Sequence, residues 1–213
     1  MHTWRTDAEA SPGPWLQEVV RSLAAGGVVA LPTDTFYGLA ADSRSAVGIA
    51  RVLQLKGRSP KHPLLLLVAD CAAARQLAPA ADSRLEELAA HFWPGPLTVV
   101  LPTAGRHLPN ELVGPTAGVA VRVPGSVVAR RVARALGAPI TGTSANRTGT
   151  PPAMAADDID LDARLLDGVV DAGVTPGELA STVVDLTGAW ARVVRAGAIP
   201  NAAISKSLDG RLV

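Results

Sequence analysis

Short apolar runs separated by segments of helical periodicity constrain this chain more than any other feature of its sequence. The apolar runs, each bounded by proline or glycine, occupy residues 28–31, 64–68, 97–101 and 118–123. Short apolar runs between turn signals predict buried strands. Residues 45–56 and 126–136 instead repeat apolar side chains every three or four positions, begin at serine and end before glycine, which predicts capped helices. We therefore expect an α/β fold.

The remaining segments continue this alternation and favour one domain. Further helices are expected at 14–25, 71–77 and 83–92, with a short one near 155–159. Further strands are expected at 139–141, 169–171 and, as a hairpin, 182–186 with 192–195. We expect a helix or a frayed tail after about residue 199. The predicted division is a loose N-terminal arm, residues 1–13, and a single domain, residues 14–213.

The composition is typical of one globular domain rather than of a disordered chain. Of the 213 residues, 48% are hydrophobic and 18% are charged. Aromatic residues make up only 3%, so the core must consist mainly of valine, leucine, isoleucine and alanine, which suits a buried, largely parallel sheet. The net charge of +1 neither supports nor excludes contact with RNA, since domains that bind nucleic acid usually carry a stronger basic excess.

The sequence carries no sign of an extracellular or membrane location. Cys71 is the only cysteine, which excludes an intramolecular disulfide and a thiolate-rich metal site. The first residues lack the basic and apolar regions of a signal peptide, and every apolar stretch of about 18 residues is interrupted by glycine, proline or charge. We therefore expect a cytoplasmic protein without membrane contact.

Two polar segments directly follow predicted elements. Thr33 and Asp34 come after the first apolar run, at the kind of strand end where α/β sheets bind ligands, although a turn that satisfies its own backbone would have the same sequence. Lys56 and Arg58 flank Gly57 at a helix end, so both cations can converge on one anion. A lysine that complements the helix C-terminus beside a solvated arginine is the alternative.

Three further segments also place polar groups at strands. The turn 141–146 carries hydroxyl and amide groups that can bind phosphate oxygens, or it is an ordinary polar loop. Arg122 stands inside an apolar strand, where an unpaired charge is costly, so it pairs either with a carboxylate-bearing substrate or with an aspartate of the chain. Ser181 and Arg195 lie at the ends of the last two strands, with a structural or a binding role.

Familiar nucleotide-binding and hydrolase motifs are absent. The sequence contains no G-x-x-x-x-G-K-[ST], no G-x-G-x-x-G opening a helix and no G-x-S-x-G elbow. Its four histidines show no spacing typical of metal ligands. If this chain binds phosphate, it must do so without a Walker-type loop.

Seven segments, taken in order, resemble the YrdC-like family of threonylcarbamoyl-AMP synthases. They are residues 31–39 (LPTDTFYGL), 56–58 (KGR), 93–98 (WPGPLT), 119–124 (VAVRVP), 143–146 (TSAN), 181–185 (STVVD) and 195–197 (RAG). Each segment alone is weak evidence, but the ordered set is highly specific and covers about residues 26–197.

The resemblance implies both a fold and an activity. The fold is α/β, with a twisted mixed β-sheet, flanking helices and a large concave cavity (the YrdC-like, or DHBP synthase-like, fold). Members of the family are L-threonylcarbamoyladenylate synthases, nucleotidyltransferases that make threonylcarbamoyl-AMP and pyrophosphate from L-threonine, bicarbonate or CO₂, and ATP. A downstream threonylcarbamoyl transferase complex then modifies an adenosine in tRNA, so weak contact with tRNA or double-stranded RNA is also expected.

The resemblance further implies roles for individual residues. Lys56 and Arg58 are the expected catalytic pair. The groups expected around ATP and its Mg²⁺ are Lys56, Arg58, His62, Ser144, Asn146 and Arg195. The groups expected around L-threonine are Thr33, Arg122, Gly142 and Ser181. Mg²⁺ is the expected cofactor, held through ATP rather than by a direct protein site.

The sequence departs from some relatives at three positions. His62 replaces an asparagine, Leu67 a histidine and Pro152 a serine, which affects individual ligand contacts but not the K-x-R and S-x-N pairs. The chain resembles the short, one-domain form of the family. A non-catalytic RNA-binding or ribosome-maturation paralogue with the same fold is the alternative function. The carbamoyl-adenylate module of hydrogenase maturation is disfavoured, because it lies in a longer chain with cysteine-rich zinc segments.

Overall fold

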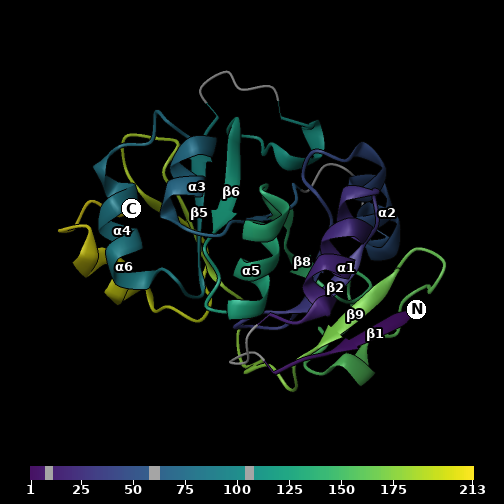
Figure 1. Ribbon diagram of the computed structural model, residues 1–213. Helices are drawn as coiled ribbons and strands as arrows, with labels where there is room; N and C mark the ends of the chain where they lie inside the picture. Colours follow the sequence, from purple (N-terminus) through teal and green to yellow (C-terminus); the bar gives the residue numbers. More distant parts are fainter. Residues whose placement is uncertain (8–11, 58–62, 104–107) are drawn as a thin grey trace.

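The strands form two mixed sheets (Figure 1). The computed structural model describes residues 1–7, 12–57, 63–103 and 108–213. The first sheet comprises, in spatial order, β1 (His2–Arg5), β9 (Gly168–Asp171), β2 (Val29–Pro32), β3 (Tyr37–Ala40) and β8 (Thr143–Ser144). The second comprises β11 (Arg192–Arg195), β10 (Thr182–Asp185), β5 (Leu97–Pro102), β6 (Gly118–Arg122), β4 (Leu66–Leu67) and β7 (Ile140–Thr141).

The predicted mixed α/β architecture is confirmed, but the strands divide between two sheets rather than one. Parallel pairing joins β1 to β9, β9 to β2, β10 to β5 and β4 to β6. The other neighbours are antiparallel, including the predicted hairpin of β10 with β11. The expectation of a largely parallel sheet, based on composition, is therefore wrong, because antiparallel hairpins and parallel crossovers can bury the same apolar strands.

The helices lie where the sequence predicts them. They are α1 (Pro14–Ala24), α2 (Ala46–Lys56), α3 (Cys71–Leu77), α4 (Ser83–Phe92), α5 (Val127–Leu136) and α6 (Asn201–Ser207), with 3₁₀ turns η1 (Asn110–Leu112) and η2 (Ala156–Asp158). The Ser45 hydroxyl accepts a hydrogen bond from the Gly48 amide at the start of α2, and Gly57 ends the helix with φ 58°. No helix in the described parts of the chain is long and apolar enough to span a bilayer.

Helices α1 and α5 pack together over strands of both sheets. Val19 and Leu23 of α1 and Val132 of α5 are fully buried in one cluster with residues of β2 and β9 from the first sheet and β7 from the second. In Figure 1 the first sheet lies on the right beside the N-terminus, and the second lies on the left with α3, α4, α6 and the C-terminus. This shared core fixes the two sheets relative to each other.

The N-terminal residues are not a loose arm throughout. His2–Arg5 forms β1, which pairs in parallel with β9, and Trp4 is buried while its indole nitrogen donates to Glu18 of α1 at 2.7 Å. The expectation for these four residues is therefore wrong, because a strand with only one buried side chain produces no periodic signal in the sequence. The boundary of the arm at residue 13 stays a prediction.

Between β7 and β8 a single glycine carries the chain from the second sheet to the first. Gly142 separates β7 of the second sheet from β8 of the first, and its amide donates to the Leu65 carbonyl at 2.9 Å. A Cβ atom at this position would lie only 2.5 Å from Cγ of Leu67. A residue without a side chain is thus required where β4 lies directly against the crossing.

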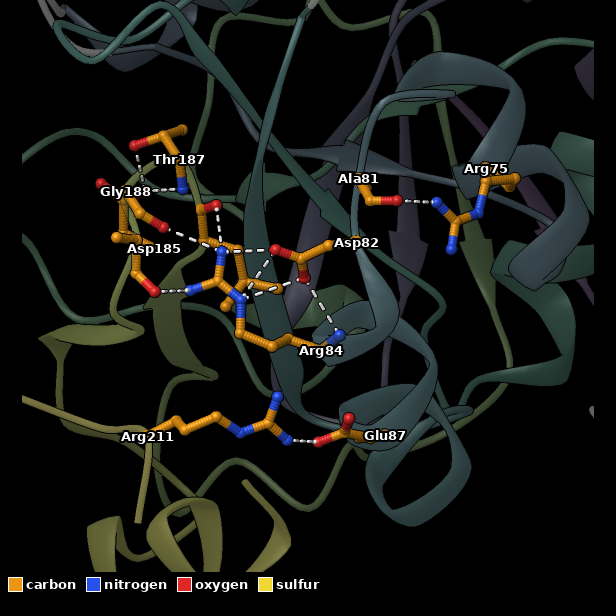
Figure 2. Close-up of polar contacts among 11 residues, drawn as sticks. Arg75, Ala81, Asp82, Arg84, Glu87, Asp185, Thr187, Gly188 and Arg211 are labelled. Carbon is orange, nitrogen blue, oxygen red and sulfur yellow. Dashed lines mark hydrogen bonds and ion pairs between the residues drawn. The ribbon is translucent and has the colours of Figure 1, made fainter. Parts of the chain in front are cut away.

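A buried arginine joins α4 to the β10–β11 hairpin, as Figure 2 shows. The Arg84 side chain forms an ion pair with Asp82, with Nη2 and Oδ2 2.7 Å apart. Its two terminal nitrogens also donate to backbone carbonyls of the hairpin turn at Leu186, Gly188 and Ala189. These contacts hold the β10–β11 hairpin, whose ends carry Ser181 and Arg195, against α4.

Candidate functional site

One cavity of about 710 Å³ is lined by both sheets and collects the predicted site residues. Its walls come from the β2–β3 turn, the end of α2, strands β4, β5 and β6, the segment after β7, and the β10–β11 hairpin. The predicted residues that line it are Thr33, Lys56, Arg122, Gly142, Ser144, Asn146, Ser181 and Arg195. Arg58 and His62 lie outside the described residues, so the structure does not test their predicted roles.

Lys56, the last residue of α2, meets the turn that follows β8. Its Nζ atom donates to the Ser144 carbonyl at 2.7 Å, to the Ser144 hydroxyl at 3.3 Å and to the Asn146 side-chain oxygen at 2.6 Å. The side chain is 4% exposed and lines the cavity. Lys56 therefore forms one ammonium-centred cluster with the predicted Ser144 and Asn146 pair, although Lys56 and Asn146 are 90 residues apart in the chain.

The turn after β8 is itself held rigidly. The Ser144 hydroxyl donates to the Asn146 side-chain oxygen at 2.6 Å, and the Asn146 amide donates to the Thr150 carbonyl. The Thr148 amide donates to the Lys56 carbonyl at 3.0 Å, which fastens the turn to the end of α2. An ammonium, a hydroxyl and an amide are groups that can donate to phosphate oxygens, and a phosphate bound here would replace some of their contacts with one another.

Arg122, at the end of β6, has partners from three directions. Its Nε atom donates to the Gly95 carbonyl at 2.9 Å, and Nη1 donates to the Thr35 hydroxyl at 3.2 Å. Nη2 lies 2.7 Å from an Asp34 carboxylate oxygen, yet within the described residues neither this nitrogen nor either Asp34 oxygen makes a hydrogen bond of good geometry. We interpret the pair as a Coulomb contact between two groups that are both buried.

Both sequence interpretations of Arg122 thus have support. The aspartate pairing is observed, and the same guanidinium, 3% exposed, also lines the cavity. Nε, one Nη1 proton and Nη2 are engaged by Gly95, Thr35 and Asp34, so a carboxylate in the cavity would bind through the second Nη1 proton. Whether it binds a substrate carboxylate stays a prediction.

Thr33 lines the cavity, but its hydroxyl is already engaged. It donates to the Phe36 carbonyl at 2.7 Å, accepts from the Thr35 amide at 3.1 Å and lies 3.0 Å from the Thr35 hydroxyl. A hydroxyl has one donor and two acceptor sites, and these three contacts use all of them. A ligand beside Thr33 would therefore contact its methyl group rather than its hydroxyl.

The β10–β11 hairpin brings Ser181 and Arg195 into direct contact. The Arg195 guanidinium donates to the Ser181 carbonyl at 2.9 Å and to its hydroxyl at 2.9 Å. The Ser181 hydroxyl also lies 2.8 Å from the hydroxyl of Thr98 on β5. The resemblance divides these two residues between the ATP and threonine sides, so their contact marks where the two sides would meet.

Sequence reasoning missed two residues around this cavity, Thr98 and Thr35, and left the partner of Arg122 open. Thr98 is a buried polar residue inside the apolar strand β5, which is the same signal that singled out Arg122 and could have found it. Thr35 lies beside Thr33 in the same turn and lines the cavity. Asp34 could be named only as one aspartate among several, because nothing in the sequence indicates which one approaches Arg122.

Tyr37 is a fully buried wall of the cavity that remains protonated. Its hydroxyl donates to the Gly173 carbonyl at 2.8 Å. Burial, with a smaller contribution from the nearby Asp171 carboxylate, raises the pKa of Tyr37 to about 12. The phenol therefore acts as a neutral, already satisfied group at physiological pH.

The described residues fit magnesium only together with a phosphate ligand. No group of three histidine, cysteine, aspartate or glutamate side chains clusters as a metal site in the described ranges. Ser144 and Asn146 do present hard oxygen atoms, but both lie within 3.3 Å of the Lys56 ammonium. A divalent cation beside that charge is favourable only if phosphate oxygens lie between them.

Comparison with known proteins identifies the family. The model of the Sua5_yciO_yrdC family, described as "Telomere recombination", matches residues 21–197. The chain belongs to this family. The threonylcarbamoyl-AMP synthase of Bacillus subtilis is 32% identical over 196 residues, which are 91% of this chain and 56% of that protein. The threonylcarbamoyl-AMP synthase of Alkalilimnicola ehrlichii is 40% identical over 152 residues, covering 71% of this chain and 78% of that protein.

A solved structure agrees with the fold over the full chain. The crystal structure of P. abyssi Sua5 complexed with L-threonine superposes with a TM-score of 0.89 at 30% identity, covering 100% of this chain and 63% of that one. The chain thus spans between half and two thirds of the length of the B. subtilis relative and of this structure. The YrdC-like fold predicted from the sequence is confirmed. Leu67 and Pro152, the two described positions that depart from some relatives, both line the cavity.

Proposed function

We propose that this chain is an L-threonylcarbamoyladenylate synthase, which makes threonylcarbamoyl-AMP and pyrophosphate from L-threonine, bicarbonate or CO₂, and ATP. One observation carries the proposal: the eight described residues predicted for ATP and threonine line the same cavity. The family and its relatives named threonylcarbamoyl-AMP synthase support it independently. A volume of about 710 Å³ is within the range of small-molecule sites and leaves room for a nucleotide beside an amino acid.

The Lys56 side of the cavity would bind the triphosphate. Lys56, Ser144 and Asn146 form one hydrogen-bonded cluster, in which the Lys56 ammonium and the Ser144 hydroxyl donate to the Asn146 side-chain oxygen, and Arg195 adds a second cation from the hairpin. By resemblance, Arg58 and His62 join them. Mg²⁺ bound to the triphosphate would neutralise charge on the phosphate oxygens. The protein's own cations would hold the α-phosphate and the leaving pyrophosphate in place.

The Arg122 side would bind L-threonine. The positive charge and the second Nη1 proton of Arg122 suit a carboxylate, while Thr33 offers a methyl surface and Ser181 a hydroxyl. At Gly142 the backbone itself lines the cavity, while Leu67 occupies the space where a side chain would lie. Recognition of the substrate hydroxyl would then fall to groups other than the saturated Thr33 hydroxyl.

Catalysis would depend on the positioning of the reactants rather than on a covalent intermediate with the protein. The threonine amine adds to CO₂ and loses a proton to form a carbamate. A carbamate oxygen then attacks the α-phosphorus in line, the bond to the β-phosphate oxygen breaks, and pyrophosphate leaves. Holding the carbamate and the α-phosphate in one geometry makes this step effectively intramolecular. Carbamates and their adenylates hydrolyse readily, so the buried walls also protect the product.

The decisive experiment identifies the product. Protein, ATP, Mg²⁺, isotopically labelled bicarbonate and L-threonine are mixed, and the mixture is analysed by mass spectrometry. The proposal predicts labelled threonylcarbamoyl-AMP, with pyrophosphate release that requires both threonine and bicarbonate. A protein that binds RNA without any threonine-dependent pyrophosphate release would instead be the non-catalytic paralogue with this fold.

The cellular context follows from the product. A threonylcarbamoyl adenylate is an activated donor, so a transferase complex that passes the group to adenosine in tRNA is the proposed partner. A cytoplasmic location and weak contact with tRNA or double-stranded RNA belong to the same proposal. Addition of a tRNA substrate and the transferase to the reaction above should consume the adenylate.

A further inference from the structure

Thr35 links Arg122 to the backbone through a chain of hydrogen bonds. The Thr35 hydroxyl accepts from Arg122 Nη1 at 3.2 Å and lies 3.0 Å from the Thr33 hydroxyl, which donates to the Phe36 carbonyl at 2.7 Å. Thr35 is 7% exposed, so water cannot easily replace these partners. The chain therefore begins at a group that can only donate and ends at one that can only accept.

The two ends fix the direction of every hydroxyl proton in between. The single hydroxyl proton of Thr33 is committed to the Phe36 carbonyl, because otherwise two acceptor oxygens would face each other at 2.7 Å. The contact between the two threonines must then use the Thr35 proton. Since guanidinium has no acceptor, Arg122 donates to the Thr35 oxygen. Each hydrogen bond polarises the next in the same sense.

We infer that Thr35 is a positioning residue, which holds the Arg122 guanidinium in the plane required to bind a substrate carboxylate. The inference rests on the proposed function for the identity of that carboxylate. With Nε held by Gly95 and one Nη1 proton held by Thr35, rotation of the guanidinium is blocked at two points. Of the terminal nitrogens, Nη2 is buried beside the Asp34 carboxylate, so the second Nη1 proton is the donor left for a substrate carboxylate, and its direction depends on the contact with Thr35.

The backbone of Thr35 is held independently of its hydroxyl, so the hydroxyl can be tested alone. The Thr35 amide donates to the Thr33 hydroxyl at 3.1 Å, and its carbonyl accepts from the Gly177 amide at 2.7 Å. Valine has the same branched shape as threonine and favours similar rotamers. Thr35→Val should therefore keep the turn while removing the link between Arg122 and Thr33.

The test compares Thr35→Val, Thr35→Ser and a matched control. Thr35→Val should raise the KM for L-threonine about tenfold, since it costs one hydrogen bond to a charged group, while the KM for ATP stays within about twofold. Thr35→Ser, which restores the hydroxyl, should recover most of the lost threonine affinity. Thr103→Val removes another buried hydroxyl, bonded to the Ala117 carbonyl outside the cavity, and should change neither KM.

Equal changes in both KM values, or a Thr35→Ser variant no better than Thr35→Val, would overturn the inference. The side-chain N–H signals of Arg122, measured by ¹⁵N NMR, give a second readout that does not depend on catalysis. Thr35→Val should speed rotation and solvent exchange at Nη1, and unchanged signals would also overturn the inference. A wild-type protein without threonine-dependent pyrophosphate release would contradict the proposed function alone, and the NMR comparison would still decide the role of Thr35.

Discussion

Two buried arginines, Arg84 and Arg122, are alike in burial and in forming an ion pair, but differ in their other contacts. Both are almost fully buried, and each forms an ion pair with an aspartate at 2.7 Å. All three nitrogens of Arg84 donate hydrogen bonds, to Asp82 and to three carbonyls of the β10–β11 turn (Figure 2). Arg122 instead has a terminal nitrogen without a hydrogen bond of good geometry, and it lines the cavity.

The difference teaches how to separate a structural charge from a functional one. Burial and an ion pair are common to both arginines and so decide nothing. A saturated arginine stabilises the fold, because its removal leaves carbonyls without donors. An arginine with unused donors at a cavity wall has capacity for a ligand, and leaving such donors buried is costly unless something binds them.

The largest expected effect is at Arg122. Arg122→Met should lower kcat/KM for threonine by about a hundredfold or more, because losing one partner of a buried charge pair costs about 2–5 kcal/mol. The measurement is pyrophosphate release at varied threonine with saturating ATP. Arg122→Lys, which keeps the charge but lacks the fork, should be intermediate. Near wild-type kinetics for Arg122→Met would break the comparison.

Lys56 extends the comparison to the other side of the cavity. Lys56→Ala should remove most activity, with an expected loss of about 10- to 100-fold from charge-assisted hydrogen bonds of roughly 1.5–3 kcal/mol. The loss should affect ATP affinity more than threonine affinity, measured as separate KM values. Circular dichroism should show a retained fold. A threonine-specific defect would mean that the two sides of the cavity are assigned the wrong way round.

Replacement of Arg84 should have the opposite effect: it should reduce stability and leave substrate binding nearly unchanged. Arg84→Met should lower the free energy of unfolding by about 2–4 kcal/mol, because the buried Leu186 carbonyl and the partly buried carbonyls of Gly188 and Ala189 lose their donors, and should change the KM for threonine by less than about twofold. Denaturant unfolding and steady-state kinetics measure the two effects. A large kinetic defect in a stably folded variant would show that saturation does not distinguish the two arginines.

The smallest effect concerns Tyr37, a satisfied but uncharged group of the cavity wall. Its pKa is raised from 10.0 to about 12, so its contribution to stability is complete below about pH 10 and is lost as the pH rises through 12. Tyr37 is the only tyrosine, so the ultraviolet absorbance of tyrosinate reports its titration directly. Ionisation of the folded protein near pH 10 would contradict the raised pKa. Tyr37→Phe should lack this alkaline loss of stability.

The local features of the fold could be predicted well. The caps of α2 and α5, at Ser45 with Gly57 and at Ser126 with Gly137, act within a few residues and so leave a signal in the sequence. Strands β1 and β8 could not be predicted in the same way. They have four and two residues, and they exist because distant partners supply their hydrogen bonds.

The candidate site was predictable as a set of segments but not as a geometry. Polar residues beside apolar strands marked Thr33, Arg122 and Ser181, and the resemblance assigned their roles. Neither source indicated that the Thr33 hydroxyl is saturated by its own turn or that Thr98 contacts Ser181. Such facts depend on angles and distances between particular atoms, which no residue pattern encodes.

The sequence alone determined most of the helices and their caps, the apolar strands and the family, because local hydrogen bonding and apolar periodicity act over short stretches of chain. Only the tertiary structure decided that the strands form two sheets, that Asp34 is the partner of Arg122, and that Lys56 meets Ser144 88 residues away. The physical reason is distance. Ion pairs and hydrogen bonds require atoms within a few ångströms, and packing of the whole core brings these atoms together.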